Sequence, residues 1–494
     1  MKINQSITAP YDFEEVKSQK YYPIDKSSTS LTPISNNNQM LKTLKKTGMS
    51  VFIIVWLGQL VSVLGSNLTN FALDVWVYQH SGSVTQLSFL FVFTTLPDVL
   101  ISPFVGVLVD KWNRRWIMIL SDLGAALSSL VMVFLLLTGK IEIWHIYLAN
   151  AVSSICNAFQ APAFTAATTL LVPKKHLARA SGMNELSEAL GELLSPILAG
   201  VLLGIINLSG IIALDLASFV FAVTTLFLVR FPNHKLRRGA EHKQEKNKTS
   251  LLQQITFGFH YLKTRSGLVG LLLFVTVNNF LTGILTILAY PLILSFASTA
   301  QLGAIMSIGG VGTLVGSLII ITWGGGRKNY INILFSFMFA NGFAMMLAGF
   351  HPSVALLTLA AFLFFMGIPF VTSSAQVIFQ KKVAPEVQGR VFSFNESIGS
   401  ASLPLAYLVA GPLADRIFEP LMTANGPLAG SIGQIIGTGP GRGIGLMFII
   451  LGILTMLVTI IAYQYAPLRR VERDLPDAYH LADEMDFTDC TDNC

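Results

Sequence analysis

Long apolar runs separated by short polar turns fill the chain from about residue 50 to residue 466. Twelve of these runs reach the roughly 20 residues that a helix needs to cross the hydrocarbon core of a bilayer. We place them at 50–78, 85–109, 116–138, 143–167, 183–206, 210–231, 267–295, 301–323, 330–350, 353–378, 391–414 and 443–466. The pattern therefore predicts an all-α integral membrane protein with twelve transmembrane helices.

Part of the first half of this pattern repeats in the second half. Glu188-Ala189-Leu190-Gly191, followed by Pro196, recurs 208 residues later as Glu396-Ser397-Ile398-Gly399, followed by Pro404. We therefore expect two pseudo-symmetric six-helix bundles in which spans five and eleven are equivalent. The predicted segments are a disordered cytoplasmic tail (1–48), a first bundle (49–231), a cytoplasmic linker with an amphipathic helix (232–266), a second bundle (267–466) and a cytoplasmic C-terminal tail (467–494).

Composition and charge place the protein in a membrane. Charged residues make up 12% of the chain and hydrophobic residues 52%, which is unlike an ordinary soluble domain. The net charge of +6 does not indicate a nucleic-acid partner, because the basic residues lie in loops between spans. Only Lys140, Arg416 and Arg442 fall in loops on the side opposite to the N-terminus. Basic loops stay in the cytoplasm, so we expect a multi-pass protein of the plasma membrane (the inner membrane of a bacterium) with both termini inside.

The turn between spans two and three is short and highly charged. It resembles the signature loop of the major facilitator superfamily, with Lys111 and Asn113 where the family has arginine and glycine. The positions that match are Gly106, Leu108, Asp110, Arg114 and Arg115. The resemblance implies a gating loop that must break when the protein changes shape, or else a topology signal alone. We expect Asp122 in span three to pair with Arg114 or Arg115 and to shape this loop.

Span five carries a second resemblance, to the glycine–proline motif that antiporters of this superfamily share. The corresponding positions are Gly182, Gly191, Ser195, Pro196 and Gly200. Small residues and a proline bend allow close helix packing. The resemblance implies a motif that keeps the cavity tight and favours export, and ordinary small-residue packing is the alternative.

Phrases in other spans resemble the macrolide-efflux and enterobactin-exporter branch of the superfamily. They are Leu96-Pro97, Ser121-Asp122-Leu123-Gly124 and the stretch from Ala158 to Phe164. This resemblance covers about residues 50–466. Span four lacks the arginine that many drug–proton antiporters carry there.

Ionisable side chains inside a membrane are costly, so each one is a candidate functional residue. Asp98 lies mid-span between two prolines, where a carboxylate can load a proton, or can be satisfied by neighbouring polar groups. Glu188 and Glu192 share one face of span five with Glu185, and we expect that face to meet a wet cavity or the other bundle. The candidates for proton coupling or for the cavity are Asp74, Asp98, Glu188, Glu192 and Glu396. Asp215 is expected to be structural.

The resemblance also implies a central cavity lined mainly by spans one, four, seven and ten. Asn278 and Asn279 in span seven are candidates to orient a substrate there. The Gly- and Pro-rich loop 416–442 either covers the outer mouth or is a surface insertion. No phosphate-binding loop and no Cys/His metal spacing occurs in the sequence, so we expect neither an enzyme nor a cofactor.

We therefore predict a monomeric secondary active transporter that works by alternating access with proton antiport. Its substrate would be a small amphiphile, such as a drug, a macrolide-like compound, a siderophore or a secondary metabolite. Two alternatives stay open from the sequence. One is a proton-coupled importer of a nutrient on the same fold. The other is a membrane sensor or scaffold that transports nothing.

Overall fold

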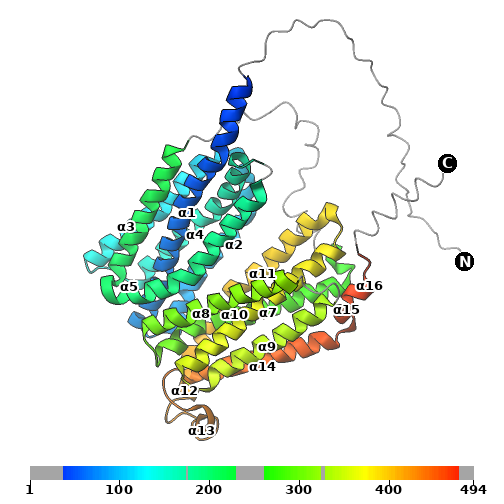
Figure 1. Cartoon of the computed structure of the whole chain (residues 1–494). Coiled ribbons are helices and arrows are strands. Elements are labelled where there is room, and N and C mark those ends of the chain that lie inside the picture. The colour runs from blue at the N-terminus through cyan, green and yellow to red at the C-terminus, as the bar shows by residue number, and fades with distance from the viewer. Residues whose placement is uncertain (1–36, 174–175, 230–260, 324–328, 478–494) are drawn as a thin grey trace, which may run out of the picture. The chain divides into compact units, whose positions relative to one another are not determined.

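The computed structural model describes residues 37–173, 176–229, 261–323 and 329–477, and within them the regular elements are helices (Figure 1). The long helices are α1 (Asn37–Ser81), α2 (Val84–Lys111), α3 (Arg114–Leu137), α4 (Ile143–Leu171), α5 (Leu177–Leu228), α7 (Ser266–Leu294), α8 (Thr299–Trp323), α9 (Tyr330–Phe350), α10 (Val354–Lys382), α11 (Pro385–Leu413) and α14 (Arg442–Gln464). Residues Gly48–Cys494 belong to one compact unit. The proposed linker helix at 251–262 lies almost wholly outside the described residues.

Ten helices of the described chain are long and apolar enough to cross a membrane. One of them, α5, contains two spans, because Asn207 interrupts it with a backbone φ of 56°. Helix α4 is not among the ten, although it has 29 residues, because polar side chains such as Asn150, Asn157 and Gln160 lower its hydropathy. Counting α5 twice and adding α4 gives twelve membrane-length segments, in agreement with the sequence.

Helices α1 to α5 form one bundle, and α7 to α11 with α14 form the other (Figure 1). Glycines allow close approach inside the first bundle. A Cβ atom on Gly58 would collide with Thr225, and one on Gly65 would lie 3.0 Å from the carboxylate of Asp215. Helix α1 therefore packs tightly on the second span of α5, because its glycines present no side chain there.

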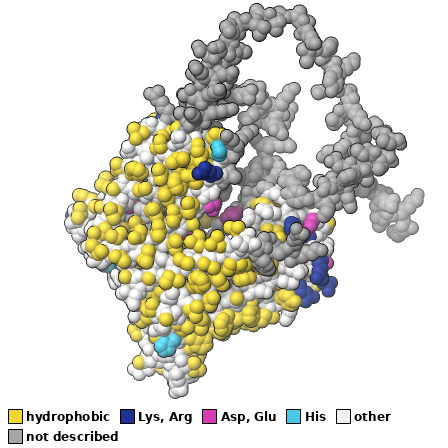
Figure 2. Space-filling model, viewed as in Figure 1, with side chains coloured by type: hydrophobic (Ala, Val, Ile, Leu, Met, Phe, Trp, Pro, Cys, Tyr) yellow, Lys and Arg dark blue, Asp and Glu magenta, His cyan; other side chains and the backbone are white. Residues whose placement is uncertain are grey.

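Glycines also allow close helix packing in the second bundle. Gly342 of α9 faces the backbone oxygen of Gly452 in α14, and Gly316 of α8 faces the backbone of Met366 in α10. Where lipid surrounds the helices, packing of this kind replaces the hydrophobic effect as the source of helix association. The outer surface suits contact with lipid, because apolar side chains cover most of the surface that is visible in Figure 2.

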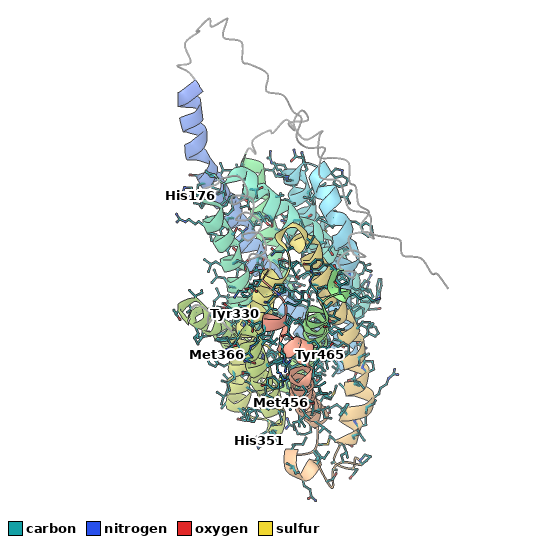
Figure 3. The ribbon with its side chains drawn as sticks, turned by 90° about the vertical axis from the view of Figure 1, so that its right-hand side faces the viewer. His176, Tyr330, His351, Met366, Met456 and Tyr465 are labelled. Carbon is teal, nitrogen blue, oxygen red and sulfur yellow. The ribbon has the colours of Figure 1, made fainter. Side chains whose placement is uncertain are left out.

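The two ends of the bundles differ in their turns. We call one end the basic end, and it holds the turns at 111–114, 171–177 and 382–385. We call the other the loop end, and it holds the turns at 81–84, 137–143, 294–299 and 350–354 and the loop after α11. Tyr330 and His351 flank α9 and mark the two ends (Figure 3).

Parts of both predicted tails are helical. Helix α1 begins at Asn37, inside the segment predicted to be a disordered tail up to residue 48. The C-terminal tail was predicted from residue 467, yet Leu468 and Val471 are fully buried in the second bundle. Both belong to short helices, α15 (Ala466–Arg469) and α16 (Val471–Asp474). These apolar residues are separated by arginines, so their sequence alone does not resemble a core.

Candidate substrate cavity and the seam between the bundles

A cavity of about 490 Å³ lies inside the second bundle, among α7, α10 and α11. Its apolar wall includes Val275, Phe379, Phe392 and Leu403, and its polar wall includes Thr276, Asn279, Thr372, Gln376, Asn395, Glu396 and Ser400. Glu396 is the charged residue of this lining. A pocket with apolar walls and a few polar groups is typical of a small-molecule site, and its volume lies in the usual range of about 300–1,000 Å³.

The two predicted asparagines of span seven have different surroundings. Asn278 is buried, and its Nδ2 donates a hydrogen bond to the backbone oxygen of Phe274 at 2.8 Å. Asn279 lines the cavity instead, 3.3 Å from the position that a Cβ atom on Gly399 would take. The structure therefore places Asn279 and Glu396 together at the cavity, and it places Asn278 within the helix packing.

The other predicted carboxylates are dispersed. Asp98, Glu188 and Glu192 have exposed side chains on α2 and α5, and their proposed roles in proton coupling stay predictions. Asp74, late in α1, is half-buried and makes a side-chain hydrogen bond with Tyr290 of α7. Asp74 therefore joins the two bundles. Its proposed role in proton coupling stays a prediction.

The expected pairing of Asp122 with Arg114 or Arg115 is wrong. Asp122 is buried, and it accepts hydrogen bonds from Gln160 Nε2 at 2.9 Å and from Gln59 Nε2 at 3.4 Å. Its helix carries it away from the loop, because eight residues of α3 correspond to about 12 Å along the axis. Asp122 thus belongs to the interior of the first bundle and not to the gating loop.

The arginines of the predicted gating loop bind the ends of other helices in the same bundle. Arg114 donates to the backbone oxygen of Ala166 in α4 at 3.3 Å. Arg115 donates to the backbone oxygens of Leu226 and Phe227 in α5 at 3.0 and 3.1 Å. Arg115 thus binds the last turn of α5, where backbone oxygens lack helical partners and a cation is favourable, whereas Ala166 lies before the last turn of α4.

The remaining positions of the predicted gating loop are Asn113, Gly106 and Asp110. Asn113, where the family has glycine, caps α3 by accepting from the backbone N–H of Arg115 at 3.1 Å. The side chain of Asp110 is outside the described residues. The gating role of Gly106 and Asp110 stays a prediction.

The two bundles meet at the loop end along what we call the seam. It consists of α2 residues 84–95 against residues 407–415 of α11 and of the π-helical turn η3 (Ala414–Phe418) that follows it, and of α5 residues 193–200 against α8 residues 299–310. At its centre Asp415, in η3, accepts from Ser83 Oγ at 2.6 Å and from the backbone N–H groups of Val84 and Thr85 at 3.0 and 2.8 Å. A carboxylate from one bundle thus caps a helix of the other.

Aromatic rings of α1, α2, α7 and α11 lie beside the seam and also join the two bundles. Tyr290 of α7 lies 5.9 Å from the ring of Phe71 and 6.0 Å from the ring of Phe91, and Phe91 lies 5.5 Å from Tyr407 of α11. Asp74 is hydrogen-bonded to this cluster through Tyr290. No pattern in the sequence indicates the cluster, because its members are scattered over more than three hundred residues.

The span-five positions lie at the second part of the seam. A Cβ atom on Gly200 would lie 2.8 Å from the backbone oxygen of Thr299, and one on Gly303 of α8 would collide with the backbone of Pro196. Gly191 and Ser195 face α1 instead, where Ser195 Oγ donates to the backbone oxygen of Leu64 at 3.4 Å. Gly182 has open space around it, so the structure does not place it in this packing.

Comparison with known proteins identifies the family of this architecture. A sequence model of the Major Facilitator Superfamily matches residues 55–407, a range that includes every residue lining the cavity. The chain belongs to the major facilitator superfamily. The predicted fold and its assignment to this family are therefore confirmed.

Relatives within the superfamily include exporters. Macrolide efflux protein A of Streptococcus pyogenes is 30% identical over 371 residues, which cover 74% of this chain and 90% of that protein. The multidrug efflux pump Tap of Mycolicibacterium fortuitum is 22% identical over 74% of this chain and 89% of its own length. The predicted resemblance to the macrolide-efflux branch is confirmed by the first of these.

Solved structures show the same fold at low sequence identity. A bacterial homologue of the human lysosomal transporter Spinster, in an inward-facing and unoccupied conformation, superposes with a TM-score of 0.64 at 14% identity over 87% of this chain and 99% of that one. The nucleoside transporter NupG gives a TM-score of 0.62 at 12% identity over 84% of this chain and 99% of that one. Both support the helical architecture alone.

Proposed function

We propose that this member of the major facilitator superfamily exports a small amphiphilic molecule across the plasma membrane by alternating access, in exchange for protons. The observation that carries the proposal is the seam, because the hydrogen bonds and aromatic contacts between the bundles gather at the loop end of the described residues. The bundles at 49–231 and 267–466 are then the two moving halves. The efflux proteins among its relatives favour the outward direction.

The orientation follows from charge. Lys381, Lys382 and the arginines at 114 and 115 lie at the basic end, which we assign to the cytoplasm together with both termini. The closed seam then faces outward, and the conformation is one that would load substrate from the cytoplasm. Opening the seam would require Asp415 to leave the N-terminus of α2.

The cavity of the second bundle supports an amphiphilic substrate. Its apolar wall offers contact area, while Asn279, Gln376 and Glu396 offer hydrogen bonds and one negative charge. A macrolide-like compound fits this chemistry because it combines an apolar ring with hydroxyl groups and an amine. The monomer contains the whole cavity, so no second subunit is required for it.

The experiment that tests this site is accumulation of a labelled macrolide in cells that express the wild type or Glu396→Gln. We expect the wild type to lower accumulation in a way that a protonophore abolishes, and Glu396→Gln to lose most of this effect. Asp474→Asn, which neutralises an exposed carboxylate in α16 outside the cavity, is the matched control. Export would be contradicted if cells with the wild type and cells without the protein accumulated macrolides and other amphiphiles equally.

A further inference from the structure

The interior of the first bundle contains a carboxylate with no cation beside it. Asp122 of α3 is only 3% exposed, and within the described residues its hydrogen-bond partners are two carboxamides, Gln59 of α1 and Gln160 of α4. Nearby arginines do not serve it, since Arg114 and Arg115 bind backbone oxygens elsewhere. Withdrawing an ionised carboxylate from water without a counter-ion is costly, and binding a proton removes that cost.

Close packing of the neighbouring helices leaves little room for a counter-ion to enter. A Cβ atom on Gly124 would lie 2.6 Å from Cys156 Sγ of α4, and one on Gly58 would collide with Thr225 of α5. These contacts hold α3 against α4 and α1 against α5 on either side of Asp122. A proton is small enough to reach such a site, whereas a lysine or arginine side chain is not.

The carboxamides of Gln59 and Gln160 connect Asp122 to helices α1 and α4. Gln160 Nε2 donates both to Asp122 Oδ1 at 2.9 Å and to Gln59 Oε1 at 2.7 Å, so one amide group links α1, α3 and α4. Its other polar atom, Gln160 Oε1, is buried and has no partner within the described residues. The network is therefore short of one donor when Asp122 is ionised.

We propose that Asp122 binds the proton that drives export, and that Gln160 transmits its protonation to α1 and α4. The proposal rests on the proton-driven export proposed above. When the Gln160 carboxamide rotates by half a turn, its Oε1 accepts a hydrogen bond from the O–H of protonated Asp122. Oε1 then has the partner that it otherwise lacks. The same turn withdraws Nε2 from Gln59 Oε1 and breaks the link between α1 and α4. No covalent bond between heavy atoms changes, and the proton enters from one aqueous phase and leaves to the other.

The titratable groups around Asp122 are few. Helix α4 presents the thiol of Cys156, and α1 presents the uncharged Gln59. The second span of α5 presents Asp215 two turns further along α3, where Ser66 and Ser129 donate to it at 3.3 and 3.2 Å. Helix α2 carries Asp98, whose side chain is exposed.

Among the described residues, the second bundle has no carboxylate at the equivalent position. Helix α9, which corresponds to α3 by its order in the bundle, has no acidic residue and buries the neutral amide of Asn341 against Gly367 of α10. The proposed proton site is therefore specific to the first bundle, while the cavity with Glu396 lies in the second.

Asp122→Asn tests the proposal in the full chain reconstituted into liposomes, with radiolabelled erythromycin as the probe. Asparagine keeps the size of the side chain but holds no exchangeable charge. We expect the wild type to accumulate label when a proton gradient is imposed, and Asp122→Asn to lose this accumulation while still exchanging labelled for unlabelled erythromycin. Proton-driven accumulation by Asp122→Asn equal to that of the wild type would overturn the proposal.

Infrared spectroscopy separates this proposal from the function on which it rests, because it needs no substrate. We expect the wild type to show a protonated carboxylic-acid band that changes with pH and is missing in Asp122→Asn. Thr94→Val, which removes a neutral hydrogen bond between α2 and Asn150 of α4, should leave the band unchanged. A band that persists in Asp122→Asn overturns the proton site, whereas the expected band in a protein that moves no label indicates that only the proposed export is wrong.

A second variant covers the case in which Asp122→Asn fails to fold. Gln160→Met keeps Asp122 and removes both the donor and the unpaired acceptor. We expect the infrared band of Asp122 to titrate at a shifted pH in this variant, because the ionised and the protonated carboxyl lose different partners. A titration identical to that of the wild type would show that Gln160 does not sense the proton.

Discussion

Asp415 is partly buried and Asp122 is buried, and each obtains its hydrogen bonds from a different source. Asp415 uses two backbone N–H groups at the start of α2 and the hydroxyl of Ser83. The positive end of the helix dipole adds to these bonds. Asp122 uses side-chain amides far from any helix terminus, where no dipole assists it. At the scale of residues, we therefore assign Asp415 to holding the seam and Asp122 to carrying the proton.

Asp415→Ala should weaken the seam. The substitution removes a cap from α2 and the contact between the bundles at the same time, which typically costs about 1–2 kcal/mol. If the closed seam alone loses this energy, the ratio of closed to open molecules falls roughly 5- to 30-fold. The measurement is the distance between spin labels at Lys140 and Ser431, two exposed positions at the loop end, by pulsed electron resonance.

The labelling requires that the native cysteines, Cys156, Cys490 and Cys494, are first replaced. Arg416→Ala is the matched control, because Arg416 is the exposed neighbour of Asp415. We expect a longer-distance population in Asp415→Ala and none in the control. Unchanged distances in both variants would show that Asp415 does not hold the seam.

At the scale of helices, the seam depends on two backbones that approach each other without side chains between them. Gly303 of α8 faces the backbone of Pro196 in α5, and Gly200 faces that of Thr299. A proline inside α5 leaves a backbone oxygen without its usual helical partner, which makes this stretch suitable for a bend. Two positions of the antiporter-like motif, Pro196 and Gly200, therefore lie where the bundles touch, and the role of the motif in export remains a proposal.

Gly303→Val should prevent α5 and α8 from closing, because its side chain would occupy the space of the Pro196 backbone. We expect a strong loss of transport and a wider loop end in the same distance measurement. Gly204→Val is the control, since Gly204 lies one turn beyond Gly200 on α5 and has open space around it. Wild-type transport by Gly303→Val would mean that the close approach is dispensable.

Periodic apolar runs were sufficient to predict the helices, since their length and their separation by polar turns do not depend on tertiary structure. The seam could not be predicted in the same way. Asp415 lies 330 residues away from Thr85 in the sequence, and its helix-capping role becomes visible only when both bundles are folded. The partners of Asp122 were predicted wrongly for a related reason. Proximity in sequence to Arg114 suggested a pair, whereas the two arginines bind backbone oxygens of α4 and α5.

At the scale of the whole molecule, the C-terminal segment closes the basic end of the second bundle. Lys382 is buried, donates to the backbone oxygen of Glu472 at 2.7 Å and forms an ion pair with Asp477 at 2.7 Å. Glu472 in turn accepts from the backbone N–H groups of Tyr330 and Ile331 at the start of α9, both at 3.1 Å. These contacts tie α10, α9 and residues 466–477 together.

Truncation should therefore depend sharply on its position. A chain that ends at residue 477 keeps these contacts, and we expect its melting temperature in detergent to match that of the full chain. A chain that ends at residue 465 loses Leu468 and Val471, whose burial contributes roughly 1.5–3 kcal/mol each, and should melt at a lower temperature. Lys382→Met should also destabilise, whereas Lys381→Met, next to it and 4.6 Å from the ring of Tyr330, should have a smaller effect.

The contrary result would be equal melting temperatures for the two truncated chains. It would show that residues 466–477 rest on the bundle without stabilising it. The same experiment bears on the alternative of a scaffold, because a transporter should keep its flux when the chain ends at residue 477.

Proton-driven export is tested by the direction in which the solute moves. The measurement uses the full chain in liposomes sorted so that the basic end faces outward, with labelled erythromycin outside and an acidic lumen. We expect label to accumulate in the lumen against its concentration gradient as protons leave, and a protonophore to abolish this accumulation. Label that leaves a preloaded lumen together with protons would instead identify an importer and would rule out proton-driven export.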